Sequence, residues 1–185
     1  VDSRAWVKNG TIQSIENEIL TGFLVQGSGS AVNAQPSTVN AQLRSVPLSY
    51  AQTGVYFECL KNPTSTIYNI PYLLSYPEET DAERLVEAVK QVVACHPELS
   101  VHFMTEGDQI VQTTDDTIVP TITISEMTDE ALATYKNEFV QPFNLQRPPL
   151  YRFEVIKTES GVHLWLDVHH LVFDGGSADL FIRQI

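Results

Sequence analysis

Cysteine is scarce in this sequence, and its scarcity argues against two common ways of stabilising a small domain. Only Cys59 and Cys95 occur among the 185 residues, in separate apolar stretches. A disulfide framework needs more cysteines, and a zinc site needs cysteine and histidine at close, regular spacing, which is missing here. We therefore expect two buried free thiols, no metal, and a reducing, cytoplasmic environment.

Basic residues are also few, which argues against several classes of partner. The chain has 11 Lys and Arg residues against 23 Asp and Glu residues, for a formal net charge of -12. Nucleic acid and anionic membranes both attract basic patches, so neither is an expected partner. No apolar run reaches the length of a transmembrane helix, and the polar first residues do not resemble a signal peptide. Because the first residue is Val1, we expect a piece of a longer protein.

The composition divides the chain into three parts. Residues 1–25 contain Asn9-Gly10 between two alternating runs, a strong hairpin signal, and are interpreted as the tail of a preceding domain or a docking hairpin. Residues 26–45 are rich in small and polar residues and are expected to be a poorly ordered or extended linker. Residues 46–185 are the main domain, and a chain that is 43% hydrophobic can bury a sizeable core.

Apolar periodicity gives the main domain a mixed order of helices and strands. Ser49 is expected to cap a helix whose apolar face is formed by Tyr50, Val55, Phe57 and Leu60. Pro71 predicts that a strand over residues 67–76 lies at a sheet edge or contains a bulge. The other expected elements are a helix opened by a capping box over residues 80–83, a hairpin over 101–112, a strand over 118–124, a helix from Thr128, and a hairpin of strands over 150–156 and 162–170.

The most informative stretch covers residues 167–177. It ends a strand in which apolar residues 162, 164, 166 and 168 alternate with others, which predicts one buried face. Continued by one step, the alternation puts His170 on that face and His169 on the other. Gly175 and Gly176 then predict a sharp turn, and Ser177 predicts the N-cap of a helix. A lone histidine here would be interpreted as a core residue, but this pattern at a strand end indicates a functional site.

The spacing His169-His170-x-x-x-Asp174-Gly175-x-Ser177 resembles the signature of nonribosomal peptide synthetase condensation domains, in the chloramphenicol-acetyltransferase-like superfamily. Three further stretches support the resemblance in the family's order: Ser49-x-Ala51-Gln52, then His96-x-x-Leu99-x-x-x-Phe103, then Pro142-Phe143-Asn144-Leu145 with Pro149-Leu150-x-Arg152. The second stretch departs from the family, because Cys95 and Ser100 replace arginines and Pro97 replaces a glutamate.

The resemblance implies an α+β fold, with a mixed, mostly antiparallel sheet and flanking helices that form one chloramphenicol-acetyltransferase-like lobe. The family has two such lobes, with the active site in a tunnel between them. The second lobe's marker, Asp-Phe-Gly-Trp, does not occur in this sequence. Residues 46–185 are therefore expected to be the N-terminal lobe of a condensation domain, without its C-terminal lobe and inactive alone.

The resemblance also implies a reaction, amide bond formation between aminoacyl or peptidyl thioesters carried on the phosphopantetheine of carrier proteins. No cofactor is expected to bind directly, and the implied partners are carrier proteins, neighbouring synthetase domains and the missing lobe. His170 is the expected catalytic residue, because histidine titrates near neutral pH. His169, Asp174, Gly175 and Ser177 are expected to shape the site, with support from Arg152, Ser49 and Gln52.

Specific roles follow for three of these residues. His169 is expected to anchor the loop by hydrogen bonding, and the Gly175 N–H is a candidate donor to the reaction intermediate. Asp174 is expected to bond an arginine and fix the loop, with Arg152 as one candidate partner. Three other functions stay open at this point: an epimerization domain of the same superfamily, a degenerate, non-catalytic lobe that docks carrier proteins, and a free-standing acyltransferase that uses coenzyme A.

Overall fold

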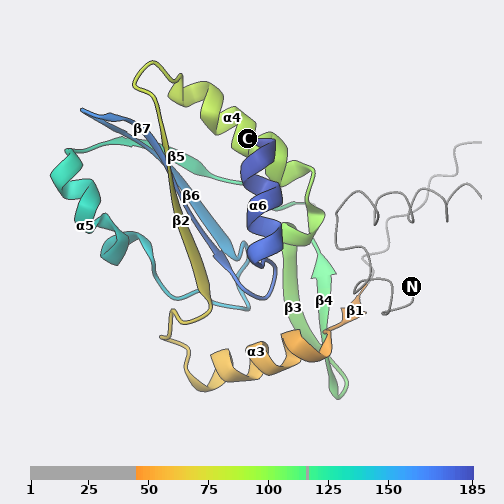
Figure 1. Ribbon diagram of the computed structural model, residues 1–185. Coiled ribbons are helices and arrows are strands. Elements are labelled where there is room, and N and C mark those ends of the chain that lie inside the picture. Colours follow the sequence, from red (N-terminus) through yellow and green to blue (C-terminus); the bar gives the residue numbers. More distant parts are fainter. Residues whose placement is uncertain (1–44, 116) are drawn as a thin grey trace, which may run out of the picture. The chain divides into compact units, whose positions relative to one another are not determined.

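A computed structural model describes residues 45–115 and 117–185 (Figure 1). The expected Asn9-Gly10 hairpin and the linker up to residue 44 lie outside the described residues. No helix in the described ranges is both long and apolar enough to span a bilayer. In chain order the elements are β1 (Val46–Pro47), α3 (Tyr50–Lys61), β2 (Asn69–Tyr76), α4 (Ala82–Ala94), the 3₁₀ helix η1 (Pro97–Ser100), β3 (Val101–Glu106), β4 (Gln109–Thr114), β5 (Ile122–Glu126), α5 (Asp129–Phe139), β6 (Tyr151–Thr158), β7 (Gly161–His169) and α6 (Gly175–Gln184).

The strands form two sheets, and the larger one carries the site. Its order is β2-β7-β6-β5, with antiparallel pairing at β2-β7 and β6-β7 and parallel pairing at β5-β6. The smaller sheet, β1-β4-β3, is antiparallel throughout. The predicted α+β class with mostly antiparallel pairing is confirmed. Pro71 does lie in an edge strand, β2, where its missing N–H is tolerated.

The central strand β7 is buried along its whole length, so the predicted single buried face is wrong. Its side chains do alternate as expected: Val162, Leu164, Leu166 and Val168 pack with residues of α4 and α6. Trp165 points to the other face and packs with Leu132 and Phe139 of α5. Because helices cover both faces of this sheet (Figure 1), the polar side chains on the second face are buried and need partners.

Helix starts follow local hydrogen bonds, and two of the four described α-helices start at the expected cap. Ser49 caps α3 in a reciprocal capping box with Gln52, and Thr128 caps α5. Asp81, rather than Thr80, caps α4 by accepting the Arg84 N–H at 3.0 Å. Asp81 is one residue nearer to the first helical residue, so its carboxylate reaches the free N–H groups directly.

Three smaller expectations are wrong. Helix α3 packs through Tyr56 against Phe103, with ring centroids 5.7 Å apart, while Tyr50 is 97% exposed. Strand β5 begins at Ile122 rather than at residue 118. Both thiols are free, as predicted, but Cys95 at the end of α4 is exposed and Cys59 is half-buried.

Gly161, at the turn between β6 and β7, is expected to be intolerant of substitution. Its φ of 150° is rare for residues with a side chain, and an added Cβ would lie 2.5 Å from the Tyr76 carbonyl oxygen. We expect Gly161→Ala to lower the free energy of unfolding of the intact domain by roughly 2–4 kcal/mol in urea titrations. Gly54→Ala is the matched control, because Gly54 lies inside α3 with open space around it and the change should stabilise by about 0.5–1 kcal/mol. Equal effects of the two substitutions would contradict this interpretation of the turn.

Candidate active site

His170 lies just beyond the end of β7 and opens to a cavity. The strand ends at His169, and the His170 N–H donates to the Tyr68 carbonyl at 2.8 Å. The side chain is exposed, so the prediction that it lies on the buried face of residues 162–168 is wrong. The strict alternation stops because the chain leaves the pleated strand at this residue. The imidazole is therefore available to a ligand.

The cavity beside His170 has a volume of about 470 Å³. It is bordered by the first turns of α3, by η1, by β4 and by the loop that joins β7 to α6. Its lining residues are Ala51, Gln52, Val55, Glu98, Gln112, His170, Leu171, Val172, Phe173, Asp174 and Ser177. Segments far apart in the sequence thus meet around one accessible imidazole.

The neighbouring histidine, His169, is 3% exposed and has a different environment. Its Nδ1 accepts the Leu171 N–H at 3.2 Å, and its Nε2 lies 3.5 Å from the Cys59 sulfur. Since Nδ1 accepts, the proton of the neutral ring sits on Nε2 and points to that sulfur. Burial, reinforced by the adjacent His170, lowers the pKa of His169 to about 4. At neutral pH His169 is an uncharged part of the turn that carries His170.

Asp174 is the N-cap of α6, a role that was expected of Ser177. Its Oδ1 accepts both the Ser177 N–H and the Ser177 hydroxyl at 2.8 Å, so Ser177 is not the N-cap. Gly175 and Gly176 form the first helical turn rather than a sharp turn, and a Cβ at Gly175 would meet no described atom within 4 Å. The hydrogen bonds from Ser177 lower the pKa of Asp174. The carboxylate thus fixes the loop through a helix N-terminus, which favours negative charge.

We expect Asp174→Ala to destabilise the intact domain by about 1 kcal/mol, the typical cost of losing an acidic N-cap. Asp174→Asn should retain most of the stability, because an amide oxygen can also accept the Ser177 N–H. Asp179→Ala on the exposed side of the same helix is the control and should have a negligible effect. Urea titrations would contradict the capping role if the two alanine variants lost the same stability.

Gln52 connects three of the segments around the cavity. Its Oε1 accepts the Ser49 N–H at 2.9 Å, and its Nε2 donates to the Leu171 carbonyl at 3.0 Å and to Gln112 Oε1 at 3.1 Å. The cap of α3, formed by Ser49 and Gln52, therefore lies next to the loop that follows His170. Gln112 was not found from the sequence, because a glutamine in an alternating strand carries no local signal of its position.

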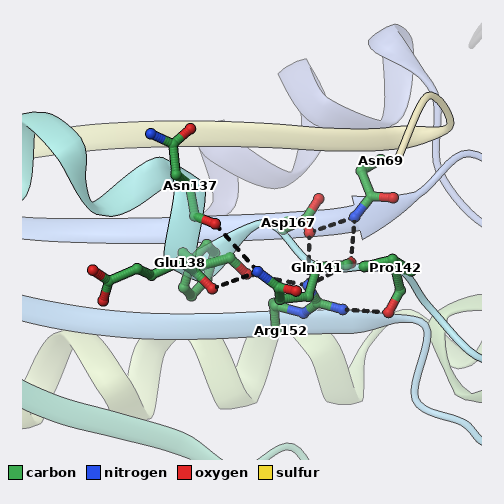
Figure 2. A network of polar contacts seen from close by, with 8 residues as sticks. Asn69, Asn137, Glu138, Gln141, Pro142, Arg152 and Asp167 are labelled. Atoms are coloured by element: carbon green, nitrogen blue, oxygen red, sulfur yellow. Dashed lines mark hydrogen bonds and ion pairs between the residues drawn. The ribbon is translucent and has the colours of Figure 1, made fainter. Parts of the chain in front are cut away.

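Arg152 does not approach Asp174, contrary to the suggested pairing. It lies 3.3 Å from the buried Asp167 carboxylate and donates to carbonyls of the segment after α5 (Figure 2). Register explains this, because Arg152 on β6 is directly opposite Asp167 on β7. The Asp174 carboxylate is instead bonded by the N–H and the hydroxyl of Ser177.

His96, at the altered second stretch, bonds Glu98, which lines the cavity. Its Nδ1 lies 2.8 Å from Glu98 and its Nε2 lies 2.6 Å from Gln184 at the end of α6. The hydrogen bond with Gln184, followed by that with Glu98, raises the pKa of His96. His96 thus joins η1 to α6, and its side chain is 18% exposed.

The sequence of this chain is similar to a known family and to subunits of several synthetases. The sequence model of the family described as Condensation domain matches residues 42–185. The chain is 33% identical to surfactin synthase subunit 2 of Bacillus subtilis (strain 168) over 140 residues, which are 75% of this chain and 4% of that protein. It is 32% identical to tyrocidine synthase 3 of Brevibacillus parabrevis over 139 residues, which are 75% of this chain and 2% of that protein. The chain thus spans a few per cent of these multidomain relatives.

Comparison with solved structures agrees on the fold. The starter condensation domain of rhizomide synthetase matches with a TM-score of 0.69 at 22% sequence identity, over 76% of this chain and 37% of that chain. The first condensation domain of the CDA synthetase matches with a TM-score of 0.65 at 23% identity, over 76% of this chain and 37% of that chain. At these identities the likeness establishes the fold, and the expected chloramphenicol-acetyltransferase-like lobe is confirmed.

Proposed function

The chain belongs to the condensation-domain family of nonribosomal peptide synthetases and corresponds to its N-terminal lobe, and on this basis we propose that it supplies the catalytic histidine for amide bond formation. The observation that carries the proposal is the contrast between the two histidines. His170 opens to the 470 Å³ cavity, while His169 is buried and engaged in hydrogen bonds. Of these two histidines, only His170 is open to a substrate.

The proposed reaction joins an acceptor amine to a donor thioester. The amine nitrogen bonds to the thioester carbonyl carbon, the C–S bond breaks, and the nitrogen loses one proton, which ends on the leaving thiol. A neutral imidazole can take that proton from the nitrogen and pass it to the thiolate, a role typically worth about 10² to 10⁴ in rate. The reaction also requires that the amine and the carbonyl be held together, and this depends on protein surfaces on both sides of His170.

The proposed substrates are aminoacyl or peptidyl groups on the phosphopantetheine arms of carrier proteins. The relatives are subunits of multidomain synthetases, which supports carrier proteins and neighbouring synthetase domains as partners. Because the cavity is bordered here by one lobe, we expect residues 1–185 alone to form no amide. The second lobe of the family is proposed to complete the site.

The test is a condensation assay with the intact domain, a donor carrier protein loaded with an aminoacyl group and an acceptor carrier protein loaded with a second one. Mass spectrometry of the acceptor's phosphopantetheine should show a dipeptidyl thioester, with free thiol on the donor. Inversion of the donor's α-carbon without amide formation would instead identify an epimerization domain. Carrier binding without either product would identify a non-catalytic docking lobe, and both results would overturn the proposal.

A further inference from the structure

An ion pair between a buried carboxylate and a partly exposed arginine lies on the face of the larger sheet that carries His169. The Asp167 side chain is 0% exposed, with Oδ2 accepting the Asn69 amide at 2.7 Å and lying 3.3 Å from Arg152 Nη1. Burial raises the pKa of Asp167, and the Asn69 hydrogen bond and the Arg152 charge oppose that rise. Since burying such a pair is costly, its presence is weak support for a purely stabilising role.

The Arg152 side chain donates hydrogen bonds to carbonyl groups at the end of α5 and in the segment after it (Figure 2). Its Nη1 donates to the Phe139 and Gln141 carbonyls at 3.1 and 2.7 Å, and its Nη2 donates to the Pro142 carbonyl at 3.5 Å. Asn69 donates to the same Gln141 carbonyl at 2.9 Å. The planar guanidinium thus fixes the path of an irregular segment that no sheet or helix holds.

The next residue of that segment, Phe143, contacts both Arg152 and His169. The Arg152 guanidinium carbon is 4.0 Å from the centre of the Phe143 ring, a cation–π contact. The ring meets His169 edge-on, with centroids 5.9 Å apart and an interplanar angle of 89°. His169 in turn accepts the Leu171 N–H, which sets the backbone immediately after His170.

We infer that Arg152 is a positioning residue for the turn that carries His170, and that it acts through the Phe143 ring. The inference rests on the proposed function of His170. Arg152 thus has a role other than pairing with Asp174. The guanidinium orients the Phe143 ring, and that ring restricts the His169 side chain. His169 in turn holds the backbone of the turn by its hydrogen bond. A catalytic group displaced by about 1 Å can lose about 10² in rate, so a small shift of Phe143 is enough to affect turnover.

The test compares Arg152→Met, Phe143→Leu and the double variant in the intact domain, with Arg147→Met as the matched control on the same segment. Each single variant should lower kcat by about 10- to 100-fold. The KM for the loaded acceptor carrier should change by less than about twofold, because no contact to the carrier is removed. The double variant should be no slower than the slower single variant, since both changes break one chain of contacts. Arg147→Met should match the wild type.

A spectroscopic readout separates positioning from simple loss of stability. In both single variants the ¹⁵N signals of the His169 ring should move and its pKa should rise from about 4 towards the ordinary 6.5, because water reaches the ring. Phe143→Leu leaves the ion pair intact, so it keeps the test valid if Arg152→Met does not fold. A wild-type kcat in Phe143→Leu, or fully additive losses in the double variant, would overturn the inference.

The two proposals fail in distinguishable ways. If His170→Ala retains full activity, the proposed function is wrong and this positioning role is wrong with it. If His170→Ala is inactive while Phe143→Leu and Arg152→Met turn over like the wild type, the proposed function stands and only the role of Arg152 is wrong.

Discussion

Replacing His170 by alanine should reduce amide formation in the intact domain by about 10² to 10⁴, with little change in stability. The rate falls because no other imidazole lines the cavity among the described residues. Stability should change by less than about 0.5 kcal/mol, because the His170 side chain is exposed and its backbone N–H, which bonds Tyr68, is kept. Single-turnover assays with preloaded carriers measure the rate, and urea titrations measure the stability.

Two control variants sharpen this experiment. His102→Ala removes an imidazole from β3, outside the cavity lining, and should leave the rate of amide formation unchanged. His170→Gln keeps a hydrogen-bonding side chain of similar size but cannot accept a proton at neutral pH. It should be as slow as His170→Ala if proton transfer is the role of His170, whereas near-wild-type turnover in His170→Gln would refute that role.

The sequence predicted the order of elements well, because hydrophobic alternation and capping residues act locally. The buried stripe of α4 and the hairpin of β6 and β7 are examples, and both are confirmed. Burial on the second face of β7 could not be predicted, because Trp165, Asp167 and His169 look like solvent-facing positions in an alternating strand. Their burial depends on α5 and on the segment containing Phe143, which is a tertiary effect.

The identities of most site residues were predicted, but their arrangement in space was not. The signature identified His170. Extending the alternation of β7 by one residue placed the His170 side chain on the buried face, which is wrong, because the alternation of a strand need not continue past its last paired residue, His169. A pairing of Arg152 with Asp174 looked plausible from residue types, whereas the cross-strand register pairs Arg152 with Asp167. Nothing in the sequence indicated Gln112, because its position at the site depends on the contact between β4 and α3.

The buried neighbour, His169, should make the domain sensitive to mild acid. Its pKa is about 4 in the folded protein and 6.5 for an ordinary histidine, so between these values the unfolded chain binds a proton that the folded protein does not. The stabilising contribution is complete above pH 6.5 and is lost as the pH falls towards 4. By linkage it should amount to roughly 2 kcal/mol between pH 7.5 and pH 5.

His169→Asn isolates this contribution, because an asparagine oxygen can replace Nδ1 as acceptor of the Leu171 N–H without titrating. The variant should be less stable than the wild type at pH 7.5, since it leaves space beside Cys59 and Phe143. That difference should shrink by roughly 2 kcal/mol at pH 5, measured by urea titration at both pH values.

His96→Asn provides a control of opposite sign. The pKa of His96 is raised, chiefly by its hydrogen bond with Gln184, so its contribution to stability is present below pH 6.5 and is lost as the pH rises through the folded value. His96→Asn should therefore cost more at pH 5 than at pH 7.5, whereas His169→Asn should cost less. If both variants changed with pH in the same direction, burial of a neutral His169 beneath the catalytic turn would not be the cause of the acid sensitivity.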